Sequence, residues 1–239
     1  MTDVITLKAL HDNYIYLYPY DSTNAVAIDP CDTALVLKEL QQRKLTLKMA
    51  LVTHHHFDHT AGISDLKKQT NCQVIAPDAK ITGLDKQVSD GDTIQIGSEK
   101  IEVIATPGHT RTSVCYYLRP SNKNGVLWTG DTLFMAGCGR IFECSAEAMF
   151  ESLQRLASLP DDTLVYCGHN YTAENYEFAL SIEPDNETIK QHLLKAQKAN
   201  EKGNPTVPST IADEKKTNVF LRAASPQTFA ELRRKKDFF

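Results

Sequence analysis

The sequence predicts an α+β fold in which two β-sheets pack face to face with helices outside them, followed by a helical domain. Strand-like apolar runs mix with helical periodicity over residues 1–170, and the polar residues suited to chemistry stand on loops that follow strands. After Tyr171 the strand-like runs stop and helical patterns continue. We therefore expect a sandwich domain at 1–170 and a helical domain at 171–239.

Each element follows from its own pattern. In chain order, strands are expected at residues 5–9, 14–18, 25–29, 50–53, 73–76, 93–96, 100–105, 114–118, 126–129 and 164–167. Helices are expected at 33–42, 61–69 and 146–159, and Ser145 is a suitable N-cap for the last of these. The C-terminal part predicts helices at 173–182, 187–202 and 226–238 and a helical turn centred on Ile211, with Ser225-Pro226 as an N-cap and first-turn pair.

The most informative segment is residues 53–59, which read Thr-His-His-His-Phe-Asp-His. Imidazole nitrogens and carboxylate oxygens bind zinc, iron and manganese. The segment follows a short apolar strand, so His54 and His56 are expected to point to one side and His55 to the other. The turn that follows can bring Asp58 and His59 to a neighbouring point. This arrangement suits two adjacent metal ions, and it differs from the helical zinc motif with histidines four residues apart.

Three later strands end in residues of the same kind. His109 follows a strand through a Pro-Gly turn, and Asp131 and His169 each follow a strand and a glycine. An isolated histidine is more often a hydrogen-bonded core residue than a ligand. The recurrence at strand ends nevertheless favours one shared site. His11 and His192 lack this context and are expected to be ordinary residues.

Composition excludes several classes of protein. The chain has 239 residues, 41% of them hydrophobic, and a net charge of −4. No apolar run approaches the ~20 residues that cross a bilayer, the first residues lack a secretion-signal pattern, and there is no dense basic face for nucleic acid. The six cysteines show no C-x-x-C spacing. We expect a cytoplasmic monomer that binds neither nucleic acid nor membrane.

The ligand pattern His-x-His-x-Asp-His, followed by Gly-His, Gly-Asp and Gly-His, resembles the metallo-β-lactamase superfamily. Segments 130–143, 167–172 and 233–237 resemble the hydroxyacylglutathione hydrolase (glyoxalase II) family, and the resemblance spans the whole chain. It implies an αββα sandwich with a C-terminal helical domain. It also implies hydrolysis of S-(2-hydroxyacyl)glutathione thioesters, with S-D-lactoylglutathione giving glutathione and D-lactate in methylglyoxal detoxification.

The resemblance also implies a ligand set for two divalent ions. One ion would be held by His54, His56 and His109, the second by Asp58, His59 and His169, and Asp131 would bridge them. Zinc is the expected metal, although these ligand types also accept iron or manganese. A hydroxide shared by the ions would attack the thioester carbon. Asp58 and Asp131 are the expected catalytic residues, and Asp58 has a second role open to it as proton acceptor.

The leaving group explains why no further catalytic side chain is needed. A thiol with a pKa near ~8.5 departs as thiolate without a general acid. The chain contains neither a G-x-S-x-G elbow nor an S-x-x-K pair.

Glutathione carries two carboxylates, so its site should contain cations. By the resemblance, the residues that bind it are Arg140, Phe142, Tyr171, Arg233 and Lys236. Phe142 stands where some family members have tyrosine, so it offers a ring without the hydroxyl contact. Arg233 and Lys236 are three residues apart and share a helix face, and we expect both at partly exposed positions. The alternative for this pair is a solvated helix end that interacts favourably with the helix dipole.

Other functions stay open at this point. The main alternative is a sulfur dioxygenase that acts on glutathione persulfide with one iron, and the helical segment 171–239 argues against it. A regulatory or RNA-processing member would need an added domain and a basic surface. A β-lactamase or lactonase would not need a cationic clamp for glutathione.

Overall fold

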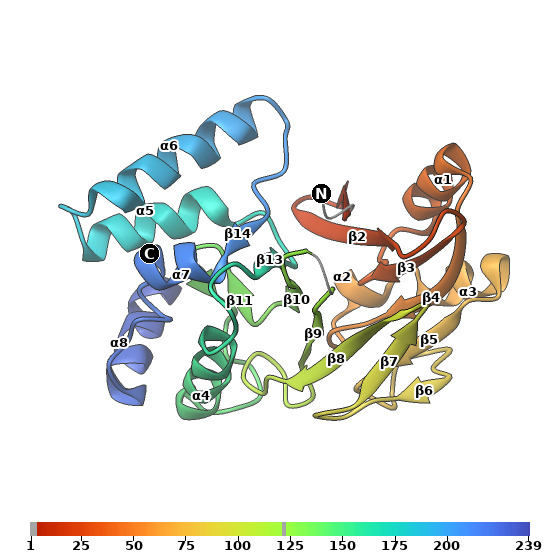
Figure 1. Cartoon of the computed structure of the whole chain (residues 1–239). Helices are drawn as coiled ribbons and strands as arrows, with labels where there is room; N and C mark the ends of the chain where they lie inside the picture. The colour runs from red at the N-terminus through yellow and green to blue at the C-terminus, as the bar shows by residue number, and fades with distance from the viewer. Residues whose placement is uncertain (1–3, 121–122) are drawn as a thin grey trace.

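The computed structural model describes residues 4–120 and 123–239, and Figure 1 shows the arrangement of their helices and strands. The first sheet has the order β1-β2-β3-β4-β5-β6 and the second the order β14-β13-β10-β9-β8-β7. The strands of the first sheet are β1 Ile5–Ala9, β2 Asn13–Pro19, β3 Asn24–Ile28, β4 Thr46–Leu51, β5 Gln73–Ala76 and β6 Lys86–Gln87. Those of the second are β7 Thr93–Ile96, β8 Glu99–Ala105, β9 Val114–Leu118, β10 Val126–Gly130, β13 Leu164–Cys167 and β14 Ser209–Thr210. A small hairpin pairs β11 Leu133–Phe134 with β12 Gly137–Cys138.

The helices lie outside the sheets or follow them in the chain. They are α1 Thr33–Arg43, α2 Phe57–Thr60, α3 Ile63–Thr70, α4 Ala146–Ala157, α5 Thr172–Ile182, α6 Glu187–Glu201, α7 Ile211–Thr217 and α8 Pro226–Asp237. In Figure 1, α1 and α3 lie on the outer side of the first sheet, whereas α4 to α8 gather around the second. Within the described ranges, no helix has the length and apolar character needed to span a bilayer.

Strand β2 shows how alternation builds the layers. Its tyrosines Tyr14, Tyr16 and Tyr18 belong to the large core that also contains the second sheet, whereas Ile15 and Leu17 belong to the core beneath α1 and α3. Successive side chains of a strand point to opposite faces, so one buried strand serves both layers. The predicted sandwich, with sheets inside and helices outside, is confirmed.

The predicted elements of the sandwich are present within a few residues of their expected ends. Ser145 caps α4 by accepting from the Ala148 amide, and Ser225 caps α8 in the same way, with Pro226 in the first turn. The predicted helix 61–69 begins later, at Ile63, after the separate turn α2. Strands β6, β11 and β12 were not predicted, because two residues are too few to show a period.

The C-terminal segment departs from prediction in two places. Strand β14 lies beyond Tyr171 and pairs antiparallel with β13, so the expectation that strands stop there is wrong. The predicted helical turn at Ile211 is longer than expected, because α7 begins at Ile211 and continues to Thr217. Tyr176, Phe178 and Phe229 also join the core of the second sheet. The two predicted domains therefore share one apolar core.

Candidate metal centre and adjoining cleft

The predicted metal ligands come together because of the directions in which their strands run. Strand β9 runs antiparallel to both β8 and β10, and β13 runs parallel to β10, so the carboxyl ends of β8, β10 and β13 lie at one edge. His109, Asp131 and His169 follow these three ends. A hydrogen bond of 3.0 Å from the Val114 amide to the Thr53 carbonyl joins this edge to the loop after β4. Ligands from both sheets therefore reach one point.

The loop after β4 has the alternation that the sequence predicts. His54 and His56 face His109, whereas His55 turns away, with its ring nitrogens 3.4 Å from carboxylate oxygens of Asp78 and Glu143. The single turn α2 then carries Asp58 and His59 back toward the cluster.

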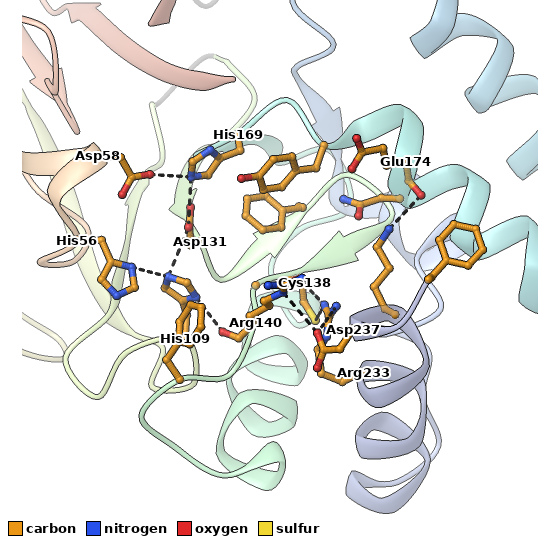
Figure 2. A pocket seen from close by; sticks show the side chains of 17 residues that line it. His56, Asp58, His109, Asp131, Cys138, Arg140, His169, Glu174, Arg233 and Asp237 are labelled. Carbon is orange, nitrogen blue, oxygen red and sulfur yellow. Dashed lines mark hydrogen bonds and ion pairs between the residues drawn. The ribbon is translucent and has the colours of Figure 1, made fainter. Parts of the chain in front are cut away.

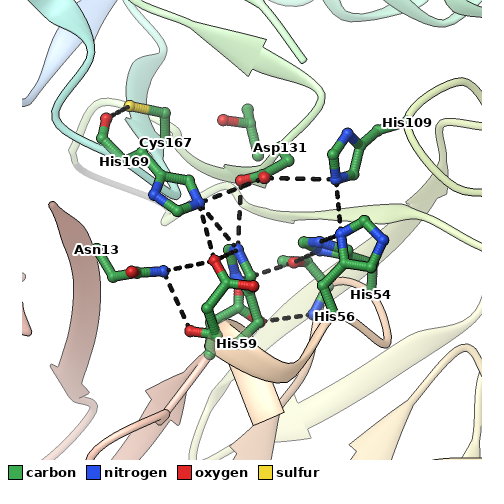
Figure 3. A network of polar contacts seen from close by, with 12 residues as sticks. Asn13, His54, His56, His59, His109, Asp131, Cys167 and His169 are labelled. Carbon is green, nitrogen blue, oxygen red and sulfur yellow. Dashed lines mark hydrogen bonds and ion pairs between the residues drawn. The ribbon is translucent and has the colours of Figure 1, made fainter. Parts of the chain in front are cut away.

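The seven predicted ligands form three overlapping groups, each with its ligand atoms within 4.8 Å of one another. These groups are His54, His56 and His109; His54, His59 and Asp131; and Asp58, His59 and His169. Figure 3 shows Asp131 between the other members. Its Oδ2 lies 3.4 Å from His109 Nε2 and 3.3 Å from His169 Nε2, and its Oδ1 lies 3.4 Å from His59 Nε2. Asp131 is thus placed to touch both outer groups.

The spacing of the donor atoms suits bound metal ions better than direct hydrogen bonds among these side chains. His56 Nδ1 lies 3.1 Å from His54 Nε2 and 2.9 Å from His109 Nε2, and His59 Nε2 lies 3.3 Å from His169 Nε2. Zinc–nitrogen bonds of ~2.0–2.1 Å at a tetrahedral ion separate neighbouring nitrogens by about 3.3 Å. The buried Asp131 Oδ1 has no hydrogen-bond partner among the described residues. The cluster is consistent with a dinuclear metal site.

Burial and charge set the protonation of this cluster. Burial holds the pKa of His54 well below its ordinary value, and it also lowers the pKa of His56 and His109. For Asp131, burial opposes ionisation, but the charges of His59 and His169 outweigh it and hold the pKa of the carboxyl well below its usual range. The imidazoles of His54, His56 and His109 are therefore neutral, and the carboxyl of Asp131 is ionised. These are the protonation states that bind metal.

One supporting residue was missed in the sequence. Asp29 Oδ2 accepts from the Thr53 hydroxyl at 2.7 Å and lies 2.9 Å from His59 Nδ1, and Asp29 Oδ1 accepts from the Thr53 amide. A partner behind a ligating imidazole fixes its orientation and raises its basicity. Asp29 also ends a strand-like run in a carboxylate, the pattern that singled out Asp131, so the signal was present.

A cleft of about 560 Å³ adjoins the cluster (Figure 2). It is lined by five of the predicted ligands, His56, Asp58, His109, Asp131 and His169, and by all five predicted substrate residues, Arg140, Phe142, Tyr171, Arg233 and Lys236. His54 and His59 lie behind this lining and are 1% exposed. The structure therefore brings the two predicted sets of residues into one cavity.

Lys236 and Arg233 of α8 both line this cleft, which does not fit the alternative in which they form a solvated helix end. Lys236 is half-buried, donates to the Glu174 carbonyl at 3.2 Å, and lies 5.5 Å and 5.1 Å from the ring centres of Phe178 and Phe239. Burial lowers the pKa of its ammonium. The neighbours Arg234 and Lys235 are exposed.

The expectation that Arg233 is partly exposed is wrong. Arg233 is 7% exposed and donates to the Cys138 carbonyl at 2.9 Å and to Asp237 Oδ1 at 3.0 Å. Part of its guanidinium is therefore engaged with the backbone at Cys138, just before Arg140, and is not free to bind a ligand.

The remaining predicted substrate residues surround the ligands. The Tyr171 ring stacks on His169 with centres 4.8 Å apart, and Phe142 lies edge-on to His109 at 5.2 Å. Phe142 is 61% exposed, and the Arg140 side chain is 64% exposed. Arg140 and Phe142 are therefore accessible from the open side of the cleft.

C-terminal side chains also hold the β11–β12 hairpin, which links Asp131 to Arg140. Asn175 donates to the Met135 carbonyl, Asn218 donates to the carbonyls of Phe134 and Gly137, and Glu214 accepts from the Ala136 amide at 2.8 Å. Together with Arg233, these contacts satisfy successive backbone groups of the hairpin. The helical segment thus sets the path of the chain between the metal-type cluster and the cleft.

Comparison with known proteins agrees with this architecture. A family model described as "Metallo-beta-lactamase superfamily" matches residues 20–169, and one described as "Hydroxyacylglutathione hydrolase C-terminus" matches residues 170–239. A hydroxyacylglutathione hydrolase of Chromohalobacter salexigens is 45% identical over 95% of this chain and 89% of its own. One from Photobacterium profundum is 40% identical over 100% of both chains.

Solved structures share the fold. The crystal structure of ETHE1 from Myxococcus xanthus has a TM-score of 0.73 and 30% identity, and the match covers 97% of this chain and 89% of that one. The relatives that match over the full length and the family match of residues 170–239 identify the family more specifically than the shared fold does. The chain belongs to the hydroxyacylglutathione hydrolase family of the metallo-β-lactamase superfamily.

Proposed function

We propose that this chain hydrolyses S-(2-hydroxyacyl)glutathione thioesters, with S-D-lactoylglutathione as the substrate that gives glutathione and D-lactate in methylglyoxal detoxification. The observation that carries the proposal is the single cleft in which the His/Asp cluster adjoins Arg140, Tyr171 and Lys236. We propose that the protein acts in the cytoplasm as a monomer, with this small molecule as its partner.

The proposed cofactor is a pair of divalent ions, zinc in the first instance. His54, His56 and His109 would hold one ion, and Asp58, His59 and His169 the other, with Asp131 between them. When bound, such ions supply an activated water and polarise the thioester carbonyl. The histidine and carboxylate donors also accept iron or manganese.

Asp58 is the proposed proton acceptor at the nucleophile as well as a ligand. Its side chain is 40% exposed and lines the cleft, and its Oδ2 accepts from Asn13 at 3.0 Å. The hydrogen bond from His169 holds the pKa of this carboxyl below its ordinary value. The side chain is thus held in the ionised form that binds metal, and it would accept the proton of a water activated by the ions only transiently.

Substrate binding is assigned to the other end of the cleft. Arg140 and Lys236 would pair with glutathione carboxylates, and the Tyr171 hydroxyl would donate to the same moiety. Arg233 would act chiefly through the Cys138 carbonyl and Asp237, which it already contacts. Phe142 offers an apolar edge beside the metal cluster instead of a hydroxyl.

The competing activity is sulfur dioxygenation of glutathione persulfide with one iron. The likeness to the ETHE1 structure, which covers 97% of this chain, shows a shared fold and does not decide between the two activities. The match of residues 170–239 to the hydrolase family favours thioester hydrolysis.

Two assays on one preparation decide between these activities. Thiol release from S-D-lactoylglutathione is expected, without oxygen uptake when glutathione persulfide is supplied. Oxygen uptake with persulfide and no thiol release from the thioester would overturn the proposal. A simple thioester that lacks the glutathione carboxylates serves as the control for substrate recognition.

A further inference from the structure

The turn between β1 and β2 is joined directly to the loop that carries His169. The Tyr14 amide donates to the Gly168 carbonyl and the Asn170 amide to the Asp12 carbonyl, each at 2.8 Å. Asn13 and His169 form an isolated antiparallel bridge between these segments. The backbone of residues 12–14 is therefore fixed against the cluster although it is far from it in sequence.

Two adjacent side chains, Asp12 in this turn and Asn13 at the start of β2, contact two proposed ligands of the same ion. Asp12 Oδ1 lies 2.8 Å from His169 Nδ1. Asn13 Nδ2 donates to Asp58 Oδ2 at 3.0 Å and to the Asp58 carbonyl at 3.1 Å; Figure 3 draws both hydrogen bonds from the labelled Asn13. Asn13 is 5% exposed, so its amide is held in this position. The turn thus orients one imidazole and one carboxylate at once.

The supporting contacts differ between the two groups of ligands. In the first group, His54 Nδ1 lies 3.1 Å from the Thr53 hydroxyl and His109 Nδ1 lies 2.8 Å from the Arg140 carbonyl, both neutral partners. In the second group, the Nδ1 atoms of His59 and His169 face carboxylates, those of Asp29 and Asp12. A carboxylate behind an imidazole makes it a stronger metal ligand than a neutral acceptor does.

We propose that Asp12 and Asn13 are positioning residues that set the affinity of the second ion, held by Asp58, His59 and His169, separately from that of the first. Asp12 would do so by fixing and polarising His169, and Asn13 by fixing the Asp58 carboxylate that faces the same ion. This inference rests on the proposed two-ion site. It adds that the two ions are supported by different parts of the chain.

The test is metal binding rather than turnover. Zinc content and affinity are measured on the full chain by elemental analysis after dialysis and by competition with a chromophoric chelator. The wild type is expected to hold two ions. Asp12→Ala and Asn13→Ala are expected to weaken the second ion by about ten- to a hundredfold, the usual cost of removing such a partner. The first ion should keep its affinity.

Two further variants sharpen the result. Asp12→Asn keeps an acceptor for His169 but removes the charge, so its loss should be smaller than that of Asp12→Ala. His11→Ala, whose side chain is 98% exposed beside Asp12, is the matched control and should leave both affinities unchanged. If Asn13→Ala fails to fold, the Asp12 pair decides alone.

The outcomes separate the inference from the function on which it rests. Two ions bound with wild-type affinity in Asp12→Ala, or equal weakening of both ions, would overturn the selective role of the turn. A wild type that binds fewer than two ions under saturating zinc would instead overturn the two-ion site itself. Selective loss of the second ion supports the proposal.

Discussion

Glu214 carries a buried carboxyl whose ionisation should make the free energy of unfolding depend on pH. Its side chain is fully buried on α7, and its Oε2 accepts from the Ala136 amide at 2.8 Å and from Asn218 Nδ2 at 3.0 Å. Burial raises the pKa of this carboxyl to about 7 from 4.5, although the hydrogen bonds from Asn218 and the Ala136 amide oppose the shift. The native state therefore keeps a proton at pH values where the unfolded chain has released it.

The sign of the effect follows from this difference. The stability that protonated Glu214 contributes is fully present below pH 4.5 and is lost as the pH rises through about 7. At about 1.4 kcal/mol per pKa unit, the whole loss is about 3.5 kcal/mol, most of it between pH 5 and pH 8. Glutamine has the same shape and no charge, so Glu214→Gln should remove this part of the pH dependence.

Urea unfolding at pH 5 and pH 8 measures the effect. The wild type should lose roughly 2–3 kcal/mol more than Glu214→Gln between the two pH values, because contributions of other groups cancel in the comparison. The exposed Glu231→Gln is the matched control and should follow the wild type. Parallel pH profiles for the wild type and Glu214→Gln would refute the reasoning.

Three further predictions concern the site. Asp131→Ala should lower metal affinity by at least ~100-fold, the most that loss of a supporting partner costs, and should abolish thioester hydrolysis. Elemental analysis measures the bound metal and thiol release measures the activity. Full metal content with normal turnover would contradict the assignment. Lys236→Ala should lower kcat/KM for a glutathione thioester by about ten- to a hundredfold, since a hydrogen bond to a charged group contributes ~1.5–3 kcal/mol. The exposed Lys235→Ala and a thioester without the glutathione carboxylates are its controls, and equal losses in both lysine variants would make the contact nonspecific. Gly139→Ala should disrupt the loop, because a Cβ there would lie 1.9 Å from the Asp131 carbonyl oxygen; wild-type metal content and melting temperature would show that the loop can move aside.

The clustering of the predicted ligands could be foreseen because its signal is local. Four of the seven predicted ligands stand within residues 54–59, and the other three repeat one pattern, a strand end followed by a histidine or aspartate. Strand direction then brings these ends to one edge. The same reasoning could have found Asp29, which also ends a strand.

The supporting residues could not be predicted in the same way. Asp12 and Asn13 read as ordinary turn residues, and their partners His169 and Asp58 lie 157 and 45 residues away. Glu214 reads as one charge on a short helix, and only the packed hairpin shows that it is buried. Arg233 was expected near the surface for the same reason, because a basic run does not reveal which member meets a backbone carbonyl. These features depend on tertiary contacts that leave no periodic pattern.

The central claim is that bound metal at this cluster drives hydrolysis of a glutathione thioester. The direct measurement is the rate of thiol release from S-D-lactoylglutathione against the number of ions bound per chain, starting from protein stripped by a chelator. We expect no release from stripped protein and a rate that rises as divalent ions are restored. Undiminished release from protein that holds no metal would contradict it.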